Sequence, residues 1–222
     1  MYFDALIVDP NPVSRGYLWQ ATLCEPNFRR VKAVSGLTEA LNQLQKGNRY
    51  DVLLITSEVQ SENIKEFVPQ AKQIEGGREA AYVVVLKKKD QDSEKIALGI
   101  VDGTDGFLLE PFSVQSLKQV AAIAARVRGE HERQRAKAAL SLMLFEIGPK
   151  LDAYAESRRT KSDAITPQKE FIRSAQALKR LVAGNEQVYA EVAAEIFEQA
   201  PPRVPKGKYK GASKRVREME SK

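Results

Sequence analysis

The sequence predicts a doubly wound α/β domain on a five-stranded parallel sheet, followed by an α-helical extension and a basic tail. Two observations lead to this fold class. Over residues 1–127, short apolar runs alternate with segments of helical periodicity. Several runs are apolar throughout rather than at every second position, which is typical of parallel strands covered by helices on both faces. In such sheets, functional groups gather at the carboxyl ends of the strands.

Five apolar runs give the predicted strands, which are residues 3–9, 30–34, 51–55, 81–86 and 106–109. A helix is expected over Asn11–Leu23, because asparagine followed by proline favours a helix start. Another is expected over Leu37–Leu44, where apolar residues recur every three or four positions. Cys24 follows Trp19 and Leu23, and these apolar neighbours favour a buried thiol.

Helical patterns continue over residues 128–200, the predicted extension. A helix that starts after Ser113 is expected to pass Gly129, and its apolar stripe continues from Leu140 to Leu151 with a kink or end near Pro149. Residues 157–167 are predicted to be a linker, and residues 166–200 an antiparallel hairpin that turns at Gly184 and Asn185. The stripe needs an apolar partner, which is the hairpin, the sheet domain or a second copy of the chain in a homodimer.

The net charge of +6 comes entirely from residues 201–222, which hold eight basic and two acidic residues, so residues 1–200 are formally neutral. This tail has little apolar content and is expected to be disordered when free. A cluster of like charges on such a segment favours a polyanionic partner. Its basic residues are Arg203, Lys206, Lys208, Lys210, Lys214, Arg215, Arg217 and Lys222.

Composition also narrows the class of protein. A single cysteine excludes an internal disulfide and favours the reducing cytoplasm, and no apolar run is long enough to span a membrane. His131 is the only histidine, which excludes a histidine-dependent triad and a multi-histidine metal site. Phosphate-loop and dinucleotide fingerprints are absent from the sequence. We therefore expect no cofactor, no metal and no enzymatic activity.

Residues 3–127 resemble the receiver domain of two-component response regulators. The resemblance rests on the first strand, Leu6-Ile7-Val8-Asp9, and on the stretch Phe107-Leu108-Leu109-Glu110-Pro111-Phe112. It implies the receiver (flavodoxin-like) fold and a phosphorylation pocket at the carboxyl ends of the strands. In that pocket, receivers place an acidic pair after the first strand, a phosphoacceptor aspartate after the third, Ser or Thr after the fourth and lysine after the fifth.

Four of these five positions differ here. By the resemblance, Asp9 matches the first acidic position, Pro10 takes the second, Thr56 the phosphoacceptor, Lys87 the Ser/Thr position and Glu110 the lysine position. A threonine hydroxyl cannot form an acyl phosphate, a glutamate repels a phosphoryl group, and one carboxylate is too few for a Mg²⁺ site. The resemblance therefore implies a pseudo-receiver that is not phosphorylated at this site.

Two alternatives stay open for this pocket. In the first, a shift in alignment would place Ser57, one residue on, or Glu58, two residues on, at the phosphoacceptor position, where Glu58 would act as a permanent charge. The second alternative is that the chain forms an α/β domain unrelated to receivers, whose last strand happens to be followed by Glu-Pro-Phe.

The substitutions also suggest a replacement for the lost site. Lys87 and Glu110 carry opposite charges and are expected to form an internal ion pair, with Asp9 close enough to share the ammonium; otherwise residues 87–89 are a solvated basic run. The Glu110–Pro111 bond is expected to be cis, as in receivers. Phe107 occupies the position that changes rotamer on phosphorylation in receivers, and here it is expected to be a packing residue.

Three functional hypotheses follow. The first is a phosphorylation-independent adaptor in a bacterial regulatory system, docking an unidentified protein through the receiver face that residues 91–98 and 115–126 would form. The second is a nucleic-acid-associated regulator that grips phosphates with the tail. The third is tail binding to an acidic protein or an anionic membrane surface. The hairpin is uncharged on balance and is not expected to supply a basic recognition helix.

Overall fold

The computed structural model describes residues 2–87, 103–160 and 165–198. Contacts within the chain divide it into two compact units, Met1–His131 and Glu132–Lys222. The predicted boundaries at residues 127 and 200 stay predictions, and the tail, residues 201–222, lies outside the described residues.

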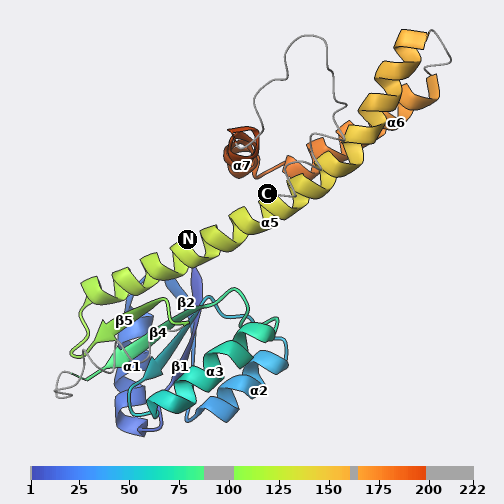
Figure 1. The fold of residues 1–222 in the computed structure, drawn as a ribbon. Coiled ribbons are helices and arrows are strands. Elements are labelled where there is room, and N and C mark those ends of the chain that lie inside the picture. Colours follow the sequence, from blue (N-terminus) through green and yellow to red (C-terminus); the bar gives the residue numbers. More distant parts are fainter. Residues whose placement is uncertain (1, 88–102, 161–164, 199–222) are drawn as a thin grey trace. The chain divides into compact units, whose positions relative to one another are not determined.

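The first unit contains the predicted parallel sheet (Figure 1). All four strand pairs are parallel, and the strand order is β2-β1-β3-β4-β5. This order is that of the flavodoxin-like doubly wound fold, so the predicted fold class is confirmed. The strands are β1 (Phe3–Val8), β2 (Phe28–Val34), β3 (Val52–Thr56), β4 (Ala81–Leu86) and β5 (Gly106–Leu109).

The helices of the first unit begin where local chemistry favours a start. They are α1 (Pro12–Cys24), α2 (Leu37–Gln45), α3 (Ser61–Gln73) and the first part of α5 (Val114–Thr160). The Asn11 side chain accepts the N–H groups of Val13 (2.9 Å) and Ser14 (3.3 Å), with Pro12 at the first helical position. Ser113 and Ser116 cap α5 reciprocally, each hydroxyl accepting the other's N–H (3.0 and 2.9 Å).

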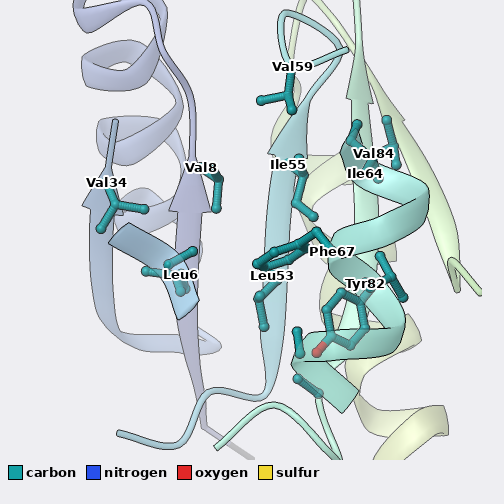
Figure 2. Packing of buried hydrophobic residues seen from close by; sticks show 14 of the residues in the cluster. Leu6, Val8, Val34, Leu53, Ile55, Val59, Ile64, Phe67, Tyr82 and Val84 are labelled. Carbon is teal, nitrogen blue, oxygen red and sulfur yellow. The ribbon is translucent and has the colours of Figure 1, made fainter. Parts of the chain in front are cut away.

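Two hydrophobic clusters lie on opposite faces of the sheet. One packs β1, β3 and β4 residues against α2 and α3; Figure 2 shows Phe67 and Tyr82 in this cluster. The other packs the alternate strand residues against α1 and α5, including Leu18, Leu117 and Val120. Strands buried on both faces explain why β1, β3 and β4 carry apolar residues at consecutive positions, with Asp4 and Thr56 as the polar residues at strand ends.

Tyr82 is the largest fully buried side chain of the first cluster. Its ring meets Phe67 edge-on with centroids 6.4 Å apart, and its hydroxyl donates to the Gly77 carbonyl at 2.9 Å. Burial raises the pKa of this phenol far above its ordinary value, so it stays a neutral donor. The buried Tyr82 hydroxyl therefore has a hydrogen-bond partner and serves a structural role.

The expectation of a buried Cys24 is wrong, because its thiol is exposed. Helix α1 buries Leu18 and Thr22, one turn apart, and Cys24 lies two positions past Thr22 on the other side of the helix. Trp19 is also 39% exposed, and its indole N–H donates to the Val31 carbonyl at 3.0 Å.

The second unit consists of the rest of α5 with α6 (Ile165–Val182) and α7 (Glu186–Glu198). Leu140 packs with Val192 and with the partly buried Leu178 and Val188, so the apolar stripe of α5 is covered by the predicted hairpin. The hairpin turns at Gly184, whose φ of 86° favours glycine.

Of the kink or end expected at Pro149, the structure excludes the end, because α5 continues to Thr160. The linker predicted from residue 157 is wrong over residues 157–160, which are helical. Proline removes one backbone hydrogen bond, but packing on both sides of it holds the helix. Leu144 contacts the hairpin before the proline, and Tyr154 stacks on Phe171 after it, with centroids 6.3 Å apart.

A charged network joins the strands at their amino ends. Asp4, only 6% exposed, pairs with Arg30 and with Arg29 (3.3 Å). The Asp51 carboxylate accepts the N–H of Asp4 at 2.7 Å and pairs with Arg128 of α5. These contacts link β1, β2, the start of β3 and α5.

We predict that Asp4→Asn lowers the free energy of unfolding by roughly 1–2 kcal/mol at neutral pH, because charge-assisted hydrogen bonds to Arg30 and Arg29 are removed. The hydrogen bond from Arg30 is the main reason that the pKa of Asp4 lies below its ordinary value. A lowered pKa stabilises the fold above the ordinary value near 4, and this stabilisation disappears as pH falls through the lowered one. Urea unfolding at pH 7 and pH 3 should therefore show a smaller deficit at pH 3.

Glu75→Gln is the matched control, since its pair with Arg49 is about three-quarters exposed on both sides. It should change stability by less than about 0.5 kcal/mol. An equal loss for Asp4→Asn at both pH values would contradict the prediction.

Candidate functional site

Strand register and one turn bring three charged residues to the carboxyl edge of the sheet. Thr56 of β3 pairs with Val85 of β4, and Leu86 of β4 pairs with Leu109 of β5. One position onward, Lys87 lies level with Glu110, whereas β3 ends at Thr56 and Glu58 lies in the turn that follows it. This edge corresponds to the pocket that the sequence predicts.

Asp9, which follows β1, is completely buried. One carboxylate oxygen accepts the N–H of Asn11 at 2.8 Å, and the other, Oδ2, has no hydrogen-bond partner among the described residues. Pro10 beside it is exposed and supplies no side-chain oxygen. Asp9 is thus a single, inward-facing carboxylate rather than half of an acidic pair.

Thr56, at the predicted phosphoacceptor position, is 1% exposed. Its hydroxyl lies 3.5 Å from the Val8 carbonyl, which makes it at most a weak donor to the backbone. A hydroxyl in this position is closed to solvent and chemically unsuited to accept a phosphoryl group as an acyl phosphate.

The predicted ion pair between Lys87 and Glu110 is wrong in its partner: Lys87 forms its ion pair with Glu58. The chain turns after β3, where the N–H of Ser57 donates to Val85 (2.8 Å) and that of Val59 to Thr56 (3.1 Å), and this turn carries Glu58 to the end of β4. Glu110 instead continues the ladder, its N–H donating to Leu86 at 2.9 Å.

The pKa of Lys87 also depends more on Glu58 than on Glu110. Its pKa is raised above the ordinary value, first by the hydrogen bond to Glu58 and by the attraction of that carboxylate. Glu110 and Asp9 contribute a smaller, longer-range attraction. Both members of the pair are about one-third exposed, so solvent screens it. The ammonium therefore stays charged and lies among three carboxylates.

Glu110–Pro111 is a cis peptide bond, as the resemblance implies. Phe107, expected to be a packing residue, is 36% exposed. The difference arises because β5 is an edge strand: Leu108 faces the α1–α5 cluster and is buried, whereas Phe107 points the other way. Residues 91–98, expected to form part of a docking face there, lie outside the described residues.

A shallow groove of about 480 Å³ adjoins the site between α2 and α3. Pro10 and Glu58 line one end, Leu37, Leu41 and Phe67 are apolar lining residues, and amide and carboxylate side chains complete the wall. Among the residues that the structure describes, no three His, Cys, Asp or Glu side chains are grouped as a metal site requires. No described helix is both long and apolar enough to cross a membrane.

Glu58 is the site residue that the sequence did not assign as the partner of Lys87. Two facts are needed to find this partner. β3 and β4 are parallel neighbours paired at Thr56 and Val85, and the turn after Thr56 carries Glu58 to the end of β4, where Lys87 follows. The sequence alone gives neither the neighbour nor the register.

No protein-family model matches the sequence, and a search of curated proteins finds no match. Response-regulator receiver domains are among the solved structures similar to part of it. A response regulator from Thermotoga maritima is 16% identical over 56% of this chain and 99% of its own, with a TM-score of 0.47. The chemotaxis response regulator CheY4 of Vibrio cholerae is 19% identical over 56% and 99%, with a TM-score of 0.44. A structure described as an adenylate cyclase from Rhodopirellula baltica is 15% identical over 61% and 96%, with a TM-score of 0.48. The fold itself rests on the strand order above.

We predict that Glu58→Gln lowers stability by up to about 1 kcal/mol, because it breaks a partly exposed ion pair. Glu110→Gln, the matched control, should cost clearly less, since Glu110 attracts Lys87 only at longer range. Denaturant unfolding of both variants at neutral pH measures the two values. A larger loss for Glu110→Gln would show that Lys87 relies on Glu110 after all.

Proposed function

We propose that the protein is a phosphorylation-independent signalling adaptor of the two-component type, acting by protein docking through a degenerate receiver domain. The observation that carries this proposal is the pocket itself. A buried Thr56 stands at the phosphoacceptor position, and Lys87 is engaged by Glu58. Both features support a domain that holds one conformation without a phosphoryl group.

The chemistry of the pocket supports the loss of phosphorylation. Phosphoryl transfer to an aspartate requires an accessible carboxylate acceptor and a divalent cation that neutralises the incoming charge. Here the acceptor is a closed hydroxyl, Asp9 stands without a second acidic neighbour, and Glu110 and Glu58 place negative charge around the site. A phosphoryl group approaching this edge meets carboxylates and a cation that is already paired.

Exposed apolar residues support docking through the edge of the sheet. Leu109 on β5 and Val114 at the start of α5 are 59% and 57% exposed, and Phe107 is 36% exposed. These three side chains lie within eight residues of sequence, with Glu110 and Ser113 between Leu109 and Val114, and we infer that they form one apolar docking patch. Patches of this kind, with an apolar centre and polar rim, are typical of protein interfaces.

We predict that the chain takes up no phosphoryl group from acetyl phosphate with Mg²⁺, since no carboxylate stands at the acceptor position. Intact-mass spectrometry measures the product, and an active receiver treated in parallel is the positive control. An acid-labile phosphoryl adduct on residues 2–131 of this chain would overturn the proposal of phosphorylation independence.

We predict that Leu109→Lys and Val114→Lys each reduce capture of the protein partner at least roughly tenfold, because a charge at the centre of an apolar contact is costly to desolvate. The measurement is quantitative affinity capture from native-host lysate treated with nuclease. Leu142→Lys in the second unit is the matched control, since Leu142 is 62% exposed on a helix outside the patch. Partner recovery that is the same for all three variants would place docking elsewhere.

A further inference from the structure

Helix α6 has one face packed inside the second unit. Phe171, Ser174, Leu178 and Val182, spaced by three or four residues, are its buried or partly buried positions. Phe171 stacks on Tyr154, and the Ser174 hydroxyl accepts from Lys150 at 2.7 Å. This face is therefore occupied by contacts within the chain.

The opposite face of α6 carries a regular row of hydrogen-bond donors. The positions recur at intervals of three, four, three and four residues, which keeps them on one line along the helix. At 1.5 Å rise per residue the row is roughly 21 Å long. Every member is exposed, and none is a carboxylate: Thr166, Lys169, Arg173, Gln176 and Arg180.

The cations of this row have no ion-pair partner among the described residues. Within the described part of the chain, Lys169, Arg173 and Arg180 form no ion pair, nor does Lys179 next to the row. Arg133 on α5, by contrast, pairs with Glu191 (3.3 Å) and with Glu195 of α7. Two carboxylates of α7 are thus paired with α5 rather than with α6, and the basic charge of α6 is exposed to an external anion.

The hairpin is nearly uncharged on balance, as expected, but its two helices differ in charge. Helix α6 holds four basic residues and one acidic residue, whereas α7 holds four acidic residues and no basic one. The two helices cancel in a sum over residues 166–200, although each has a strong charge of its own. The net charge of the hairpin therefore does not reveal the basic row on α6.

The arrangement favours a polyanion over the other candidates. Protein interfaces usually have an apolar centre and a charged rim. On α6 the centre is charged, and the exposed apolar residues Ile172 and Leu181 lie at its two borders. A helix that binds a membrane surface must free its apolar face for the lipid, and the apolar face of α6 is packed.

We propose that the outer face of α6 binds the phosphate backbone of nucleic acid without sequence preference. The row is long enough to follow roughly six base-pair steps of a duplex, at 3.4 Å each. Lys169, Arg173 and Arg180 contact phosphates as cations, and Thr166 and Gln176 donate hydrogen bonds to phosphate oxygens. Contacts of this type fix position and affinity but carry no base information. The surface lies on an element distinct from both the tail and the docking patch.

The test measures binding of the full chain to a fluorescein-labelled DNA duplex of arbitrary sequence by anisotropy, over a series of salt concentrations. The triple variant Lys169→Gln, Arg173→Gln, Arg180→Gln should weaken binding about tenfold or more near 100 mM salt. It should also flatten the plot of log K against log salt by roughly two to three units, since each phosphate that a cation neutralises adds about 0.9 to the slope. Glutamine is a good helix former, so thermal unfolding should be unchanged.

The matched control removes the same charge elsewhere. Lys46→Gln, Lys65→Gln, Arg78→Gln changes three exposed cations of the first unit and keeps the tail intact. This control should bind within about twofold of wild type, and Arg173→Lys, Arg180→Lys should retain most binding because phosphate accepts a point charge.

Equal losses in the α6 variant and the control would overturn the proposal in favour of a non-local charge effect. If the α6 triple variant binds the duplex as tightly as the wild type does, the nucleic-acid-binding surface lies on other residues and the proposal is overturned. Binding of the α6 face to phosphatidylserine vesicles or to poly-glutamate, but not to the duplex, would also overturn it. Partner capture through the β5 patch is independent of all these outcomes, so failure of one proposal leaves the other standing.

Discussion

The register of the parallel sheet is the constraint on which the site depends. Parallel pairing aligns the carboxyl ends of neighbouring strands, so residues distant in sequence meet at one edge. The pairs Thr56–Val85 and Leu86–Leu109 bring the turn that holds Glu58 to the same edge as Lys87 and Glu110, and Asp9 follows β1, the other neighbour of β3. That register is in turn held by side chains buried on both faces, because a slip of one residue would exchange the residues of the two clusters. Hydrophobic packing therefore determines which charged residues come together, and the ion pairs form as a consequence of it.

The free energies of these interactions also indicate that packing, rather than the ion pair, determines the fold. A partly exposed pair such as Lys87–Glu58 contributes at most about 1 kcal/mol. Burial of one large core side chain contributes roughly 1.5–3 kcal/mol, and the two clusters contain many. The ion pair is thus too weak to define the fold, and its consequence is electrostatic: it neutralises the cation that would otherwise attract an anion to this edge. Thr56 is closed to solvent as well, and both features support the proposal that this pocket does not take up a phosphoryl group.

The sequence predicts best what burial controls. Strand β4 was located to the residue, because an uninterrupted apolar run between polar segments has one interpretation in a doubly wound fold. The cap at Asn11 and the cis bond before Pro111 follow from local chemistry and from the resemblance. Solvent exposure was less predictable. Phe107 and Cys24 have apolar neighbours in sequence, yet both are exposed, because Phe107 lies on an edge strand and Cys24 lies on the outer side of α1. Glu58 required strand order and register, which no local pattern contains. Pro149 shows tertiary contacts overriding a local helix breaker.

Charge is distributed differently in the two units, and a net value conceals this. In the first unit, Arg30, Arg128 and Lys87 are each engaged by a carboxylate of the same fold. In the second, α7 directs its carboxylates to Arg133 while the cations of α6 face outward without an acidic partner among the described residues. Because charges are screened beyond about 8 Å at physiological salt, a local row attracts an anion even on a formally neutral body. The proposed apolar docking at β5 is expected to be insensitive to salt, whereas the proposed phosphate binding at α6 is expected to weaken steeply with it. Ionic strength should therefore separate the two proposed activities, because one surface is apolar and the other is charged.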